Sequence, residues 1–155
     1  MTGKELLLNT IHNKTMPRAA WVPFVGVHGG KLIDVTADDY LQSADLMVKG
    51  LKKAVELYKP DGIPVCFDLQ LEAEVLGCQL HWAKAVPPSV STHPLAEGKT
   101  LETLPDFDET KGRLPIVMSA LRTLKKEIGD DVALYGLICG PFTLALHLLG
   151  SEVFL

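Results

Sequence analysis

Short apolar segments that alternate with long amphipathic helices constrain this chain more than any other feature of its sequence. The apolar segments lie at residues 20–27, 63–67 and 132–138, and each has the length of a strand that is buried on both faces. Strands of that kind belong to parallel β/α units, because helices cover both faces of the sheet. The pattern predicts the order helix, strand, helix, strand, helix, strand, helix, in a single α/β domain over residues 1–155.

The helices are marked by apolar residues every three or four positions and by their end signals. Thr2 and Glu5 form a capping-box pattern at the first helix, and residues 16–18 end it. A long helix follows residues 36–39 and runs to Tyr58, with a break expected near Gly50. The remaining expectations are a short helical stretch at 69–77, a hairpin at 78–93, a polar connection at 101–113 and helices at 114–128 and 142–149.

Composition excludes several classes of protein. The net charge is −4, and no cluster of Lys and Arg is interleaved with aromatic residues, so we expect no nucleic-acid partner. No window of about 18 apolar residues occurs, so we expect no membrane span. The N-terminus lacks the apolar core of a signal peptide, and three distant cysteines without a CxxC pattern are typical of reduced thiols. These features predict a cytoplasmic protein.

Three parallel strands make a poor open sheet, because both edges stay unpaired. The chain also ends on an apolar stretch, residues 151–155. The expected fold is therefore the N-terminal part of a (β/α)8 TIM barrel, with about three parallel strands and flanking helices, incomplete in this chain. An isolated part of a barrel predicts either self-association or a requirement for the missing C-terminal half.

The residues that follow the expected strands are the candidates for chemistry, because barrel active sites lie at the C-terminal ends of strands. His28 precedes two glycines and could move a proton near neutral pH, or it could be a solvated loop residue. Asp68 directly follows an apolar strand, where a carboxylate suits NH-bearing ligands or caps the next helix. Of the two glutamates that follow it, Glu72 is the better candidate to join Asp68, because Glu74 should face elsewhere. His28 and Asp68 are thus the candidate catalytic residues, and Glu72 is a candidate binding residue.

The third strand is followed by a turn whose free amides could bind an anion. Gly140, Phe142 and Thr143 are the candidate binding residues of this turn, although Thr143 could equally be a first-turn residue of the helix. The histidines and cysteines have no metal-ligand spacing, so no metal site is expected within this chain.

Three segments of the chain resemble the uroporphyrinogen decarboxylase superfamily: residues 17–31, 61–77 and 135–150. Their order matches roughly the first half of that family's barrel. True decarboxylases carry arginines just after the first strand's Trp, where residues 22–28 hold none. The Glu-Ala-Glu-x-Leu-Gly and Gly-Pro-Phe-Thr-Leu-Ala motifs are more similar to the corrinoid-dependent branch, of the methylcobalamin:coenzyme M methyltransferase type.

The resemblance implies a complete enzyme that moves a methyl group between a corrinoid protein and a small thiol. It also implies a zinc ion that activates the thiol, held by a His-x-Cys and a later Cys in the missing half. Asp68 matches the aspartate that holds pyrrole NH groups in the decarboxylases. Two alternatives remain: uroporphyrinogen decarboxylation, and a non-catalytic fragment or split subunit. The chain by itself is expected to be inactive.

Overall fold

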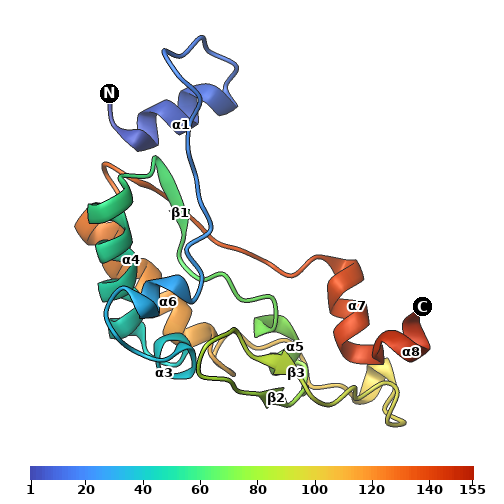
Figure 1. Ribbon diagram of the computed structural model, residues 1–155. Coiled ribbons are helices and arrows are strands. Elements are labelled where there is room, and N and C mark those ends of the chain that lie inside the picture. Colours follow the sequence, from blue (N-terminus) through green and yellow to red (C-terminus); the bar gives the residue numbers. More distant parts are fainter.

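The computed structural model describes residues 1–155, and its elements follow the expected alternation of helices and strands (Figure 1). The strands are β1 (Gly62–Pro64), β2 (Leu80–His81), β3 (Ser89–Val90) and β4 (Ala133–Tyr135). The helices are α1 (Gly3–Ile11), α2 (His28–Lys31), α3 (Ala37–Leu41), α4 (Ala44–Tyr58), α5 (Leu71–Val75), α6 (Leu114–Ile128), α7 (Pro141–Leu149) and α8 (Ser151–Phe154), with a 3₁₀ turn at Leu101–Thr103.

The predicted capping box at the start of α1 is confirmed, whereas the predicted stop at residues 16–18 was wrong, because α1 already ends at Ile11. Thr2 Oγ1 accepts a hydrogen bond from the Glu5 amide, and the Glu5 carboxylate accepts one from the Thr2 amide. This closes the capping box and satisfies two amides that the helix itself leaves free. Pro115 lies in the first turn of α6, where its missing N–H costs no helical hydrogen bond.

The long helix expected to run from residues 36–39 to Tyr58 is divided, and the expected break near Gly50 was wrong. The chain leaves α3 at Gln42, and Ser43 adopts an extended backbone and caps α4 by accepting from the Leu46 amide. A cap of this kind starts a new helix. Gly50 lies buried inside α4 instead, where a Cβ would stand 2.5 Å from the Gly29 carbonyl oxygen.

The sheet has two parallel hydrogen-bonded strands, fewer than the three expected. Strand β1 pairs with β4 in the register Gly62↔Ala133 to Pro64↔Tyr135, so residues 63–67 and 132–138 are strands only in part. The strand expected at residues 20–27 was wrong: that segment lies beside β1 without forming a ladder. The Trp21 carbonyl accepts from the Asp61 amide at 2.9 Å, but Pro23 has no N–H to continue the pairing.

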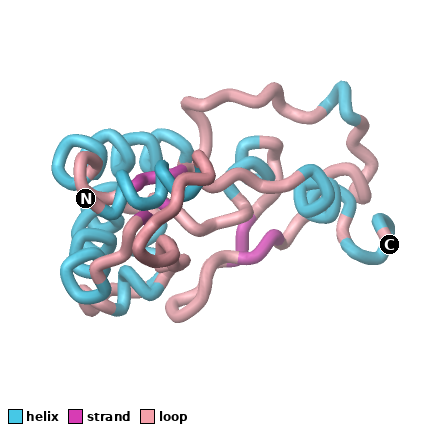
Figure 2. Tube along the Cα trace, turned by 90° about the horizontal axis from the view of Figure 1, so that it is seen from above, coloured by secondary structure: helices cyan, strands magenta, loops and turns pink.

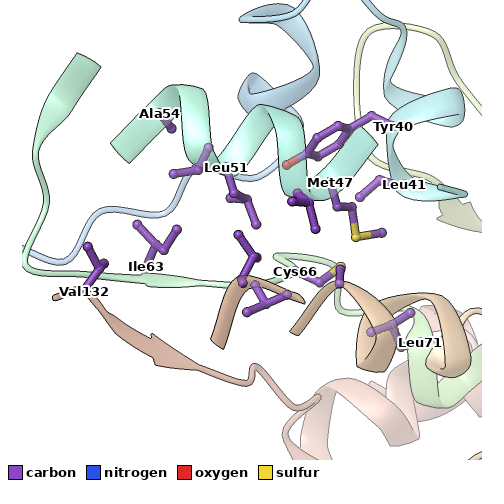
Figure 3. Close-up of a cluster of buried hydrophobic side chains, with 14 residues drawn as sticks. Tyr40, Leu41, Met47, Leu51, Ala54, Ile63, Cys66, Leu71 and Val132 are labelled. Atoms are coloured by element: carbon purple, nitrogen blue, oxygen red, sulfur yellow. The ribbon is translucent and has the colours of Figure 1, made fainter. Parts of the chain in front are cut away.

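The main core lies between α4, α6 and the β1–β4 pair, as the packing of helices on a parallel sheet requires. Figure 3 shows Met47 and Leu51 of α4 pointing toward Ile63 and Cys66 on the strand segment. All four are buried. The apolar face that the sequence periodicity predicts for α4 is therefore the face that covers the sheet.

A smaller cluster lies apart from the main core and joins α5 to α7. Its buried members are Ala73, Cys78 and Leu148. The predicted hairpin is confirmed: β2 pairs with β3 in antiparallel fashion beside α5. Figure 2 shows α7 and α8 at the opposite side of the molecule from the N-terminus. None of the helices combines the length and the hydropathy that a membrane span requires.

Candidate functional site

Asp68 follows β1 directly, and the structure buries it almost completely. Its side chain is 0% exposed, and Oδ2 accepts a hydrogen bond from Arg113 Nη1 at 2.5 Å. Oδ1 accepts from the Gln70 amide at 2.9 Å, which stabilises the turn into α5. Asp68 is not the cap of that helix, because the cap position is occupied by Gln70. The carboxylate is therefore held in one orientation at the C-terminal end of β1.

Arg113 is the cation of this site, and no local pattern in the sequence marked it as a site residue. It lies in the polar connection just before α6, is 4% exposed, and is the only buried basic residue. Its Nε donates to Glu74 Oε2 at 2.9 Å, and its guanidinium lies 4.8 Å from the centre of the Trp82 ring. Two carboxylates and one aromatic ring from separate segments thus fix the guanidinium plane.

The expectation that Glu74 faces away from Asp68 was wrong. Glu74 shares Arg113 with Asp68, while Glu72 Oε1 accepts from the Cys139 amide at 2.9 Å. The spacing argument placed only one glutamate near the site, but the long Arg113 side chain reaches the other. Glu72 still lies beside the cluster, and it joins α5 to the turn after β4.

Two further titratable side chains, Cys66 after β1 and His147 of α7, have shifted pKa values. Burial, with the Asp68 charge adding to it, raises the pKa of the Cys66 thiol to about 12, so this thiol stays protonated at neutral pH. His147 of α7 carries a buried Nε2 atom that has no hydrogen-bond partner. Burial lowers the pKa of its imidazole, with the nearby His93 ring acting in the same direction. The imidazole of His147 is therefore neutral at neutral pH, although the charges of Asp68 and Glu72 act on its pKa in the opposite direction.

His28 lies away from this cluster. It is the first residue of α2, is exposed, and its Nε2 lies 2.8 Å from the Tyr58 hydroxyl at the end of α4. The two rings stack with their centres 5.9 Å apart. Together with Trp21 and Phe24 they line a shallow pocket of about 220 Å³. No hydrogen bond or ion pair links His28 to Asp68, so the two candidate catalytic residues occupy separate places in this structure.

The turn after β4 has the form that the sequence predicts. Gly140 is the N-cap of α7 and has open space around it, since a Cβ would meet nothing within 4 Å. Phe142 is 63% exposed and contacts only the edge of the Phe154 ring among the aromatic residues. Thr143 lies in the first turn of α7, in agreement with the prediction that it could be a first-turn residue of this helix. The Glu72–Cys139 bond connects this turn to the Asp68 cluster.

The chain's own residues do not form a metal centre. No group of three or more His, Cys, Asp or Glu side chains could hold a metal ion. The buried polar cluster at the end of β1 consists instead of two carboxylates, Asp68 and Glu74, paired with one guanidinium, Arg113.

Comparisons with known proteins identify relatives of this chain. The chain is 42% identical over 86 residues to a methylated-thiol–coenzyme M methyltransferase of Methanosarcina mazei, covering 56% of this chain and 23% of that protein. It is 28% identical over 157 residues to a methylcobamide:CoM methyltransferase of the same organism, covering 99% of this chain and 46% of that protein. It is also 31% identical over 119 residues to a uroporphyrinogen decarboxylase of Francisella philomiragia, covering 75% of this chain and 34% of that protein.

A solved methyltransferase from Methanosarcina mazei shares the fold, with a TM-score of 0.86 at 24% identity over 99% of this chain. The match covers 47% of that structure, so the chain has the fold of the N-terminal part of a (β/α)8 barrel. The chain spans less than half the length of each of these relatives. The family model for uroporphyrinogen decarboxylase matches residues 2–154. The chain therefore belongs to the uroporphyrinogen decarboxylase (URO-D) family.

Proposed function

We propose that this chain is the N-terminal part of an enzyme that transfers a methyl group between a corrinoid protein and a small thiol. The observation that carries the proposal is the sequence similarity of this chain to two methyltransferases, which for one of them extends over 99% of the chain. Residues 22–28 also lack arginines that could bind the carboxylates of a tetrapyrrole. In this proposal residues 1–155 form a single partial domain, in a cytoplasmic protein.

Within the complete enzyme, the Asp68 cluster would form one wall of the active site. Arg113 holds the Asp68 carboxylate at the end of β1, so the carboxylate can accept a hydrogen bond from a bound group without rotating away. Gly140 and Thr143 would border the same opening, since the Glu72–Cys139 bond ties their turn to the cluster. His28 would act at the separate Tyr58 pocket, at the edge of the site.

Zinc, when bound, would supply the activated thiolate. The residues of this chain do not fit a zinc site, because they offer no group of three ligands. We propose that the zinc ligands belong to the remaining part of the barrel, which these 155 residues do not contain. We therefore expect this chain alone to be inactive, and to depend on that part or on self-association.

The test is made on the native polypeptide that carries this sequence. Its intact mass and zinc content are measured, and methyl transfer from methylcobalamin to a thiol is followed by absorbance. We expect Asp68→Asn to lower turnover about 100-fold, because the carboxylate orients the bound group. Glu102→Gln on the exposed 3₁₀ turn is the matched control.

Each alternative has its own outcome in this assay. Conversion of uroporphyrinogen without methyl transfer would establish the decarboxylase instead. A native mass equal to these 155 residues, with neither activity, would establish a split subunit or a non-catalytic fragment. Unchanged methyl transfer in Asp68→Asn would remove Asp68 from the active site.

A further inference from the structure

The Asp68–Arg113 pair at the end of β1 is shielded from solvent. The side chain of Asp68 is 0% exposed and that of Arg113 is 4% exposed. Asp68 accepts two hydrogen bonds, from the Gln70 amide and from Arg113, whereas a carboxylate can accept about four. One donor atom of Arg113, Nη2, is buried without a partner. The pair therefore has hydrogen-bonding capacity that burial keeps out of reach of a ligand.

Trp82 covers the guanidinium of this pair. The centre of its ring lies 4.8 Å from Arg113 Cζ. Trp82 directly follows β2 within the hairpin β2–β3, so its position is set by the hairpin rather than by the parallel sheet. The half-buried ring also packs against the main core, which holds the hairpin where it lies in this structure. The exposure of Arg113 therefore depends on the position of the hairpin.

The base of the hairpin is firmly held. The Gln79 amide donates to Thr92 Oγ1 at 2.8 Å, and the Ser91 amide donates to the Gln79 carbonyl at 2.9 Å. Cys78, which precedes these residues, is buried in the small cluster that joins α5 to α7. These contacts provide a fixed end about which the rest of the hairpin can rotate.

The rest of the hairpin is held weakly. The ladder between β2 and β3 has only two residue pairs, and a two-stranded hairpin by itself is marginally stable. At its tip the Ala37 amide donates to the Lys84 carbonyl at 2.8 Å, and Lys84 Nζ lies 3.2 Å from Asp38 Oδ2. The Lys84 side chain is 75% exposed, and an ion pair on the surface contributes little to stability. Opening such a segment costs less free energy than unfolding the whole chain.

Moving Trp82 aside would uncover groups with complementary hydrogen-bonding character. Asp68 has free acceptor capacity, and Arg113 Nη2 is a free donor on the guanidinium that Asp68 already binds. The closed position leaves Nη2 desolvated and unpaired, which is unfavourable, so its hydration offsets part of the cost of opening. The open pair would accept from a bound group and donate to it at the same place.

We propose that the hairpin β2–β3 is a lid over the Asp68–Arg113 pair. The closed lid is the arrangement in this structure. To open, the hairpin rotates about its base at Gln79, the contacts of Lys84 with α3 break, and Trp82 leaves the guanidinium. A ligand that needs the open pair binds with an affinity reduced by the open fraction, so Trp82 and Lys84 regulate access to Asp68. The inference rests on the proposed function, which makes Asp68 a wall of the active site.

The experiment measures how fast phenylglyoxal modifies each arginine of the full 155-residue chain, followed by peptide mass spectrometry. Arg122 on α6 is exposed and serves as the internal reference. The reagent reaches Arg113 only in the open state, so its rate reports the open population. We expect Arg113 to react at least about tenfold more slowly than Arg122, as for a minor conformational state. Lys84→Gln should accelerate the reaction of Arg113 about two- to fivefold, the factor that corresponds to one exposed ion pair.

Lys52→Gln is the matched control. It also breaks one exposed ion pair, with Glu127, but this pair joins α4 to α6 rather than holding the hairpin. This substitution should leave the Arg113 rate unchanged, and thermal unfolding shows whether each variant is folded. Equal Arg113 rates in Lys84→Gln and Lys52→Gln would overturn the proposal and make the hairpin a fixed part of the fold.

A parent chain in which Arg113 reacts as fast as Arg122 would also overturn the lid, because the pair would then be accessible without any opening. The assay contains no substrate, so its failure leaves the proposed function untouched. The proposed function is decided separately by methyl transfer in the native polypeptide.

Discussion

Replacing Arg113 by Met is the most informative single change in this molecule. Arg113 is the only cation that contacts Asp68, whose side chain is 0% exposed, and it also pairs with Glu74. Methionine fills similar space but leaves the Asp68 carboxylate buried and unpaired. Removing one partner of a buried ion pair lowers the free energy of unfolding by about 3–5 kcal/mol, because the other charge stays buried and unpaired. Replacing both partners by apolar residues usually changes stability much less. For Arg113→Met we therefore expect the larger loss, that of an unpaired buried charge.

Urea unfolding followed by circular dichroism measures this loss. With a slope of about 2 kcal/mol per molar urea, the midpoint should fall by about 2 M. Arg113→Lys keeps the charge but loses the planar set of donors of the guanidinium and its contact with the Trp82 ring. This variant should therefore lose less free energy of unfolding than Arg113→Met and should remain folded. In the double variant with Asp68→Asn, the uncompensated charge is gone and the loss should be smaller than the sum of the two single losses.

Two results would refute this reasoning. A loss below about 1 kcal/mol in Arg113→Met would mean that water or rearrangement satisfies Asp68 without the guanidinium. Strictly additive losses in the double variant would mean that the two side chains do not interact in the folded state. In either case the Asp68–Arg113 pair could not be what orients the candidate site.

Three other changes test the framework around the site. Arg18 donates two hydrogen bonds to Asp61 and holds the pKa of that carboxyl below its usual range. The stabilisation by this pair is therefore full above about pH 4, and it is lost as the pH falls through the folded-state pKa of Asp61. Asp61→Asn should destabilise the chain at pH 7, and acid denaturation should show that its difference from the parent shrinks below about pH 4. Gly50→Ala should lower the free energy of unfolding by about 1–3 kcal/mol in urea titrations, because the added Cβ meets the Gly29 carbonyl. This cost should exceed the gain from the better helix propensity of alanine. A more stable variant would contradict the close packing of α2 on α4. Ile138 is 81% exposed and follows β4, which pairs with a neighbour on one edge only. Ile138→Lys should therefore reduce self-association of the 155-residue chain in sedimentation experiments. A parent chain that is already monomeric at high concentration would refute this expectation.

The sequence determined the features that depend on neighbouring residues. The helices α1, α4 and α6, the hairpin β2–β3 and the turn at Gly140 follow from caps, prolines and a 3.6-residue period, all of which act within a few positions. Asp68 could likewise be selected, because an acidic residue at the end of an apolar strand is visible in the sequence.

Only the tertiary structure decided which distant groups meet. Arg113 lies 45 positions from Asp68, at the end of the segment 101–113 that the sequence predicts to be a polar connection. No local pattern in that segment marks Arg113 as buried. The same applies to His147, whose burial depends on the packing of α7 against α5. The segment at residues 20–27 has the composition of a strand, but pairing needs a neighbour with matching donors and acceptors, and Pro23 removes one. Local signals therefore predict elements, whereas burial and charge pairing between segments are set by the folded chain as a whole.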